Sequence, residues 1–310
     1  IGCTRSHSCP EMTNNKVESA GRYAELVVER TTACAVNAMA DRKPAKMHVG
    51  SIEAEGLNFV RHYSVTDRNG VMSYFGDNFG TAIFNDSTNH TTQADPTMYM
   101  LLFERASAEN IAFINWRAHP HFTGGSNLYN LSADWVGTFR DAFERQTGVN
   151  FLYFQGASGN INEKSRINSE NKSNDYRAHG NYLAEYAYEC YQNNLTETES
   201  GQIKFTQINY QGTKRAAPDY QLYMMAKEVS AMFKQTGSST QAMANVDKKI
   251  IHSVYHASAL GGHYTRKEED CKMLISAVSI GDAIGFVTFP GEAYDTIAEY
   301  VEENSPYDFN

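Results

Sequence analysis

Apolar residues recur every three or four positions in several segments, which is the spacing of one face of a helix. The first such segment runs from about residue 15 to residue 40, with Ala20, Tyr23 and Val27 on one face, and Lys43-Pro44 ends it. The same spacing predicts helices over 132–146 and 173–193, two between 218 and 259 that break near 237–239, and a last one that ends at 303.

Other segments carry apolar runs of strand length. The runs 98–103 and 111–116 are continuously apolar and are separated by a short polar turn, which predicts two buried neighbouring strands. Asn69-Gly70 is a hairpin turn signal between two further strand-like runs. The remaining predictions are strands at 149–154 and 202–210, a hairpin of 272–280 with 283–289, and a long loop over 76–95.

Predicted strands and helices interleave along the whole chain, without an internal repeat or a linker that would divide it. This order is typical of an α/β fold. We therefore predict a mixed central β-sheet flanked by helices, formed by a single domain over residues 1–310.

Composition and charge exclude some classes of function. Of the 310 residues, 41% are hydrophobic and 20% are charged, which is a globular composition. The 36 acidic residues outnumber the 27 basic ones, and this balance argues against nucleic acid as the main partner. No apolar run has the length of a transmembrane helix, so we expect no transmembrane segment.

The five cysteines favour free thiols and a reducing compartment, because their number is odd and no Cys-x-x-Cys occurs. This favours the cytoplasm. Secretion stays open, because the chain contains five Asn-x-Ser/Thr sequons, at Asn85, Asn89, Asn130, Asn171 and Asn194.

Both ends of the chain are abrupt. Ile1–Thr4 resembles the end of a strand, and residues 305–310 form a loop. These features predict a truncated or processed chain, and a missing N-terminal part that stays bound as a separate chain would add strands beside Ile1–Thr4.

Three predicted strands end in polar or glycine-rich loops, at His119, at 156–160 and at Glu292. Ligands gather where the carboxyl ends of strands and the N-termini of helices meet. His119 and Glu292 are residue types that could share a Zn²⁺ ion, with His7 as a third ligand. The glycines of 156–162 also predict a nest of backbone amides beside this pair.

Structural roles for the same residues stay open. A histidine before proline is often a turn residue, and Glu292 suits the first turn of a helix, where it faces the positive end of the dipole. His252 and His256 lie four residues apart but lack the glutamate of the His-Glu-x-x-His motif, so we expect them to be structural or exposed.

Seven short motifs occur in order along the chain: CTRSHSCP at 3–10, KPA at 43–45 with EGLNFVRHY at 55–63, NWRAHP at 115–120, LSADWVG at 131–137, FQGASGNIN at 154–162, FPGE at 289–292 and SPY at 305–307. Together they resemble the neutral/alkaline non-lysosomal ceramidase family and its bacterial relatives. The resemblance implies an amide hydrolase with one Zn²⁺ ion, acting on a small or lipid-like substrate.

The resemblance also implies roles for individual residues. His119 and Glu292 match metal ligands, and His7 matches an active-site histidine that is a candidate third ligand. Arg61 matches an arginine that lines the site. Asn160 falls in the same pocket, and Asn162 stands where the family has its nucleophilic or water-positioning serine.

Several departures from the family pattern bear on the metal. Arg5 stands where the first metal-binding histidine is expected, and a guanidinium cannot ligate zinc. Asn162 cannot attack a carbonyl, and the family's tyrosine ligand lies beyond residue 310. Arg5 either pairs with Glu292 or turns outward while His7 rotates inward; we favour the second arrangement, which preserves three ligands.

The leading hypothesis is a zinc-dependent hydrolase of an amide or ester bond, which acts through metal-activated water. Its pocket would contain His7, Arg61, His119, Asn160 and Glu292. The alternative hypothesis is a metal-free, non-catalytic protein that binds a small anionic ligand through Arg5 and Arg61.

Overall fold

The computed structural model describes residues 3–10, 12, 18–60, 63–66, 72–75, 94–124, 130–164, 175–199, 201–212, 218–247, 250–251, 253–265 and 271–307. The predictions for Arg61, His252, the turn at 69–70 and most of the loop over 76–95 lie outside these residues. The strands on either side of that turn are present and pair antiparallel, β3 (Tyr63–Thr66) with β4 (Met72–Phe75).

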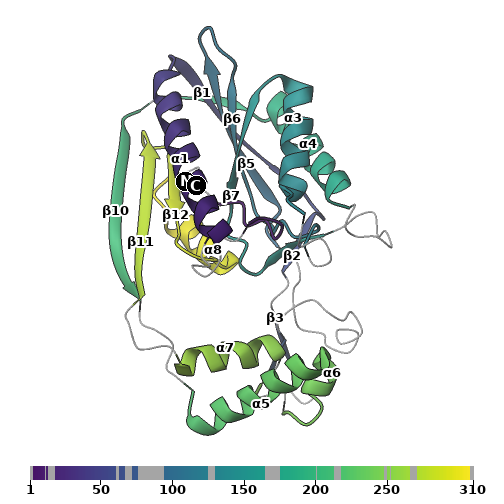
Figure 1. Ribbon diagram of the computed structural model, residues 1–310. Coiled ribbons are helices and arrows are strands. Elements are labelled where there is room, and N and C mark those ends of the chain that lie inside the picture. The colour runs from purple at the N-terminus through teal and green to yellow at the C-terminus, as the bar shows by residue number, and fades with distance from the viewer. Residues whose placement is uncertain are drawn as a thin grey trace.

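The fold is α/β with a mixed central sheet, as predicted (Figure 1). Its strands lie in the order β7 (Asn150–Gln155), β6 (Ile111–Trp116), β5 (Thr97–Arg105), β1 (Ala45–Glu53) and β9 (Thr196–Thr198). The predicted neighbours β5 and β6 pair antiparallel, whereas β6 and β7 pair parallel. Because β6 and β7 run in the same direction, the loops that follow them leave the sheet at the same edge.

Two helices cover one face of this sheet. The helix α3 (Asp134–Thr147) lies between β6 and β7 in the chain, and α4 (Asp175–Asn193) packs beside it. Both match the helices predicted at 132–146 and 173–193. Met98 and Met100 of β5 and Ile114 of β6 point into this interface and are fully buried.

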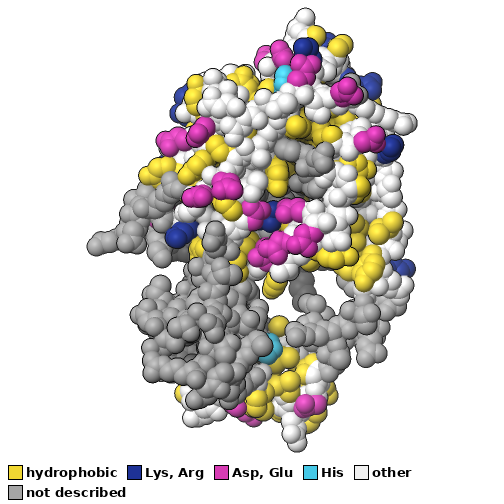
Figure 2. Space-filling model, turned by 180° about the vertical axis from the view of Figure 1, so that it is seen from behind, with side chains coloured by type: hydrophobic (Ala, Val, Ile, Leu, Met, Phe, Trp, Pro, Cys, Tyr) yellow, Lys and Arg dark blue, Asp and Glu magenta, His cyan; other side chains and the backbone are white. Residues whose placement is uncertain are grey.

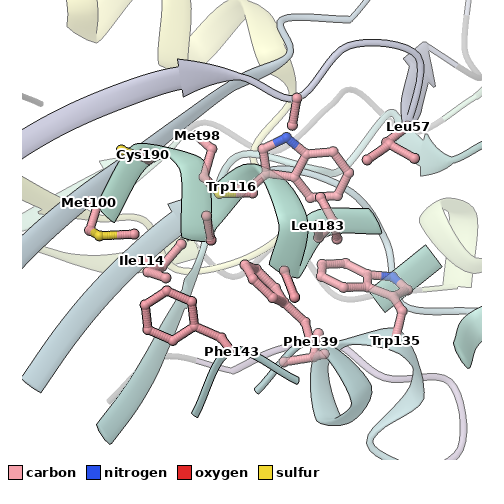
Figure 3. Packing of buried hydrophobic residues seen from close by; sticks show 14 of the residues in the cluster. Leu57, Met98, Met100, Ile114, Trp116, Trp135, Phe139, Phe143, Leu183 and Cys190 are labelled. Atoms are coloured by element: carbon pink, nitrogen blue, oxygen red, sulfur yellow. The ribbon is translucent and has the colours of Figure 1, made fainter. Parts of the chain in front are cut away.

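Aromatic rings fill the core between the helices and the sheet (Figure 3). The rings of Trp116 from β6 and Trp135 from α3 meet edge to face, with centroids 5.5 Å apart. Phe139 and Phe143, one turn apart on α3, are fully buried against Phe151 of β7. This core anchors the end of β6, directly before the segment that carries His119.

The opposite face of the central sheet meets a second, three-stranded sheet. It is formed by β10 (Ile203–Gly212), β11 (Cys271–Ile280) and β12 (Ile284–Thr288), and the predicted β11–β12 hairpin is present. Phe286 of β12 packs on Phe113 of β6, with ring centroids 5.1 Å apart. After β12 the chain runs through residues 289–294 into α8 (Asp295–Asn304).

The first of the two helices predicted between 218 and 259 is present, whereas a four-residue helix and a later helix that ends at residue 265 take the place of the second. The helix α5 (Tyr220–Thr236) ends at Gly237, whose φ of 64° is left-handed, and it packs with α6 (Ser239–Ala242) and α7 (Val254–Thr265) around a small core of their own. The long helix α1 (Glu18–Ala40) has one buried residue, Ala20. Two short strands, β2 (Asn58–Val60) and β8 (Ile161–Glu163), pair antiparallel beneath the loop that follows β7.

The surface reflects the composition. Acidic side chains are more prominent than basic ones on the face opposite that of Figure 1, and apolar side chains lie scattered between them (Figure 2). Among the described helices, none combines the length and apolar character that crossing a membrane requires.

Cys190 provides a direct test of the core. It is fully buried on α4, and burial raises the pKa of its thiol to about 12, whereas Cys3, Cys9 and Cys34 are exposed. Because the thiolate is the reactive form, we expect iodoacetamide to alkylate the three exposed cysteines in the folded protein and Cys190 only after unfolding. Peptide mass spectrometry measures this, and equal native labelling of Cys34 and Cys190 would contradict the packing of α4.

Candidate active site

Three loops meet at the carboxyl ends of β6, β7 and β12. They carry His119, the segment 156–160 and Glu292, which are the three strand ends that the sequence analysis singled out. His119 Nε2 lies 4.0 Å from Glu292 Oε2, although the two residues are far apart in the chain. The structure therefore brings His119 and Glu292 together at one edge of the sheet.

Hydrogen bonds fix the orientation of the His119 ring. The side chain is almost fully buried, and its Nδ1 lies 2.6 Å from the carbonyl oxygen of Ser158. Because a carbonyl can only accept, Nδ1 carries the proton and the lone pair lies on Nε2. The backbone N–H of His119 donates to Ile161 O at 3.0 Å, which ties the end of β6 to β8. The ring is thus held with its basic nitrogen toward Glu292.

The N-terminal loop places His7 in the same group. The backbone N–H of His7 donates to Pro120 O at 3.1 Å, and the Ser8 hydroxyl donates to Thr123 O at 2.7 Å. The His7 ring lies edge-on to the rings of His119 and His121, with both centroid distances 5.5 Å. His7 therefore packs between the other two imidazoles.

Arg5 forms an ion pair with Glu292. The φ of Arg5 is 63°, in the left-handed region that an L-residue with a long side chain seldom adopts. Such backbone strain persists where the surroundings enforce it, which makes this position notable at a candidate site. The arrangement in which Arg5 turns outward, which we favoured from the sequence, is therefore wrong in this structure.

Asn160 and Asn162 occupy different positions. The Asn160 side chain donates to Asp295 Oδ1 at 2.5 Å and accepts from Asp295 N at 2.9 Å, so it fastens the start of α8. Asn162 is buried next to His119, to which it is bridged through the backbone. Its Oδ1 has no hydrogen-bond partner within the described part of the chain.

The prediction of a nest of free backbone amides over 156–162 is wrong for Gly156 and Gly159, because both N–H groups already donate to backbone carbonyls. Gly156 N–H donates to Trp116 O at 2.9 Å, and Gly159 N–H donates to Ala293 O at 2.7 Å. A Cβ on Gly159 would lie 2.6 Å from Glu292 O, so this glycine permits the close approach of the two loops. Its role is to bring Glu292 near His119.

His121 and Glu163 form a pair that was not predicted from the sequence. The Glu163 side chain, at the end of β8, is only 1% exposed, and its Oε1 lies 2.5 Å from His121 Nδ1. Burial raises the pKa of Glu163 to about 7, against the lowering effect of His121. The available signal was an acidic residue at the end of the predicted glycine-rich loop, where the resemblance gives a proline.

A cavity of about 400 Å³ opens beside this group, between the second face of the central sheet and the segment from β12 to α8. Its apolar part is lined by side chains from β5, β6, β7, β12 and α8, which include Leu101, Phe113, Phe154, Phe286, Val287 and Ile297. Arg5 and Glu292 lie in its polar part. The cavity suits a small molecule with an apolar body and a polar end.

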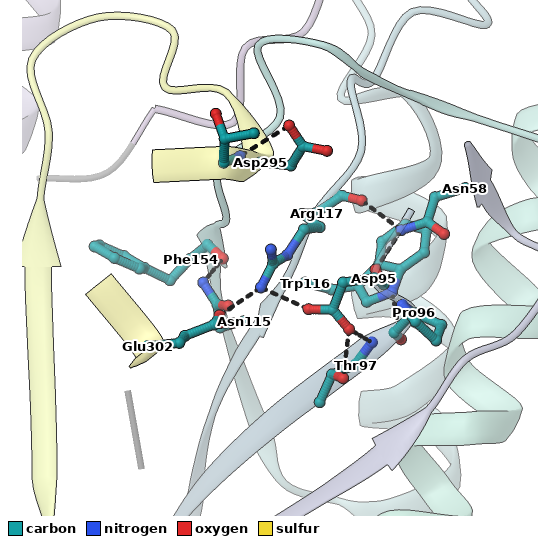
Figure 4. Close-up of polar contacts among 11 residues, drawn as sticks. Asn58, Asp95, Pro96, Thr97, Asn115, Trp116, Arg117, Phe154, Asp295 and Glu302 are labelled. Carbon is teal, nitrogen blue, oxygen red and sulfur yellow. Dashed lines mark hydrogen bonds and ion pairs between the residues drawn. The ribbon is translucent and has the colours of Figure 1, made fainter. Parts of the chain in front are cut away.

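Arg117 is the second cation of the cavity wall (Figure 4). Its side chain is 3% exposed, and its Nη2 pairs with Asp95 at 2.7 Å and with Glu302 of α8 at 2.6 Å. Two carboxylates therefore surround one guanidinium, so the positive charge is more than balanced. Neither described arginine of the cavity offers an uncompensated charge to an anion.

The residues present do not fit a zinc site with three protein ligands. His119 offers Nε2, and His7 and Glu292 are suitable residue types. However, Arg5 occupies the Glu292 carboxylate, and the described residues contain no group of three His, Cys, Asp or Glu side chains placed to hold a metal ion. The zinc of the leading hypothesis thus stays a prediction, and the ion pair opposes it.

Comparisons with known proteins give limited matches. No protein-family model matches the chain, and a search of curated proteins finds no match. Among solved structures, a neutral ceramidase from Pseudomonas aeruginosa is similar, with a TM-score of 0.49 and 15% sequence identity. The match covers 86% of this chain and 44% of the ceramidase, so the chain spans less than half of that protein's length.

Replacing the cation should create the missing ligand. In Arg5→His the ion pair with Glu292 is lost and an imidazole stands near His119, so we expect zinc affinity to rise at least about 100-fold over the wild type. Isothermal titration with zinc measures the affinity, and Arg105→His, remote from the site, is the control. An unchanged affinity in Arg5→His would show that the Arg5–Glu292 pair does not control metal binding.

The buried Glu163 should make stability depend on pH. Its folded-state pKa lies above the ordinary glutamate value of 4.5, so the folded state binds more protons than the unfolded state between that value and about 7. The free energy of unfolding therefore falls as pH rises through this range, by up to about 3 kcal/mol. Urea unfolding at several pH values measures this. Glu163→Gln should flatten the profile, and an identical slope in both proteins would contradict the burial.

Proposed function

We propose that the chain is a hydrolase that cleaves an amide or ester bond in a small amphipathic molecule. The observation that carries this proposal is the approach of His119 to the Arg5–Glu292 ion pair, whose two members line the polar part of an apolar cavity. The motif resemblance supports the same class of reaction, because three of the residues that it designates, His7, His119 and Glu292, come from distant segments and lie near one another.

The proposed step uses water as the nucleophile. The 4.0 Å between His119 Nε2 and Glu292 Oε2 is a distance that one water molecule can bridge. His119 Nε2 takes a proton from this water as its oxygen adds to the carbonyl carbon. The Arg5 guanidinium stabilises the negative charge on the carbonyl oxygen. The imidazolium then returns the proton to the leaving nitrogen or oxygen, which releases an acid and an amine or alcohol.

The charges of the cavity favour a neutral or cationic substrate. Arg5 is paired with Glu292, and Arg117 is paired with both Asp95 and Glu302. An anionic head would have to displace one of these carboxylates and would meet the others. The described residues therefore give little support to a site for small anions, and Arg61, the other arginine of that hypothesis, lies outside them.

Hydrolysis of chromogenic acyl substrates tests the proposal. We expect the purified chain to cleave neutral medium-chain acyl p-nitroanilides or p-nitrophenyl esters, and His119→Asn to lose about 100-fold or more in kcat. His48→Asn is the matched control, because His48 also contacts a glutamate but lies on β1 away from the cavity. Equal rates for His119→Asn and the wild type would contradict the proposal.

Binding without hydrolysis is the second candidate function. The Arg5–Glu292 pair favours it, because this pair occupies the carboxylate that a metal-dependent reaction would use. The same amphipathic molecules would then bind, as measured by calorimetry, and mass spectrometry would recover them uncleaved. Measuring cleavage with and without a zinc chelator separates both functions from zinc-dependent catalysis.

A further inference from the structure

The pair of His121 and Glu163 is the most unusual polar feature outside the centre just described. Glu163 is the last residue of β8, opposite Asn58 of β2, and its side chain is 1% exposed. One carboxylate oxygen contacts His121 Nδ1, and the other, Oε2, is buried without a hydrogen-bond partner among the described residues. Burying a carboxylate in this way costs folding free energy. An apolar side chain of similar size would fill the same space at lower cost.

The contacts of His121 lead back to the centre. Its ring lies edge-on to His7, and His7 lies edge-on to His119. His119 is held from the other side by Ser158 O. The outer two rings of this row are therefore each fixed through Nδ1, by Glu163 at one end and by a backbone carbonyl at the other. The His7 ring contacts both of them edge-on.

We infer that Glu163 is a positioning residue: by fixing His121, it holds the His7 ring against His119 at the proposed centre. The expected effect on kcat rests on the proposed function, whereas the holding of the His7 ring by Glu163 and His121 rests on the geometry alone. Removing the hydrogen-bond acceptor that orients a metal-ligating imidazole typically changes activity about 10–100-fold, and we expect a change of similar size here. Glu163, His121 and His7 are not among the residues that line the cavity, so the consequence falls on turnover and not on substrate binding.

The chemistry of the acceptor distinguishes positioning from proton transfer. Glu163→Met fills the space without an acceptor, whereas Glu163→Gln keeps an oxygen that accepts from His121 Nδ1–H but cannot exchange a proton at neutral pH. A positioning role therefore predicts that the Gln variant keeps a kcat close to that of the wild type and that the Met variant has a lower kcat. A proton-transfer role predicts that both fail.

The kinetic test compares these variants with the wild type on the best acyl substrate. We expect Glu163→Met to lower kcat at least about 10-fold with KM within about twofold, and Glu163→Gln to recover kcat to within about threefold of the wild type. Thermal melting should show both variants folded, because the His121 side chain is 36% exposed and water can take the place of the lost carboxylate. Glu104→Met, which breaks the surface pair with His48, is the matched control.

An unchanged kcat in Glu163→Met, or an equal loss in the Met and Gln variants, would overturn the inference. A second measurement decides the matter if the wild type proves not to hydrolyse any substrate. In protein labelled with ¹³C and ¹⁵N at histidine, ring-to-ring nuclear Overhauser effects should connect His7 with His121 in the wild type and in Glu163→Gln, and should be lost in Glu163→Met. That result would support the positioning role while hydrolysis fails, whereas ring contacts kept in all three proteins would overturn it.

Discussion

The parallel pairing of β6 with β7 is the constraint on which the core and the candidate site both depend. Parallel strands need a crossover, and α3 provides it while closing the aromatic core on one face of the sheet. The same pairing sends the loops after both strands out of one edge of the sheet. The Ser158 carbonyl therefore reaches Nδ1 of His119, and the backbone N–H of Gly159 reaches Ala293. Without this register neither the His119 ring nor Glu292 would have a fixed place.

Arg5 determines which chemistry the site around His119 and Glu292 can support. An imidazole, a carboxylate and a nearby second imidazole are a donor set that zinc commonly uses. A guanidinium on the carboxylate changes the electrostatics, because it neutralises the charge that would attract a dication and adds a repulsion of its own. The same guanidinium can donate charge-assisted hydrogen bonds to the negative oxygen that forms when a carbonyl is attacked. In the proposed reaction the site therefore combines a fixed base with a fixed cation, and the cavity beside it would hold the apolar part of the substrate.

The fold was largely predictable from periodicity. The helices over 134–147 and 175–193 and the hairpin about Gly281 lie where apolar spacing and turn residues placed them, because each buries one face or turns at a glycine. Periodicity does not reveal which distant strands pair, so neither the parallel β6–β7 pair nor the pairing of β10 with the predicted β11–β12 hairpin was predicted. These depend on contacts between distant segments.

The candidate site was predictable only in part. That His119 and Glu292 would meet followed from strand ends and motif order, but the partner of Arg5 did not, because two arrangements were sterically open. The pair of His121 and Glu163 escaped detection because burial, which makes Glu163 unusual, is a property of the folded chain. A lone glutamate in the sequence is far more often exposed.

The ion pair between Arg5 and the Glu292 carboxylate beside His119 is expected to keep a metal ion from binding that carboxylate. Crystals of the wild-type protein grown with excess zinc, measured at wavelengths on both sides of the zinc absorption edge, test this most directly. The account predicts no anomalous peak between His119 and Glu292 and density for the Arg5 guanidinium on the carboxylate. A strong peak there, with Arg5 turned away and His7 rotated in as a ligand, would contradict it.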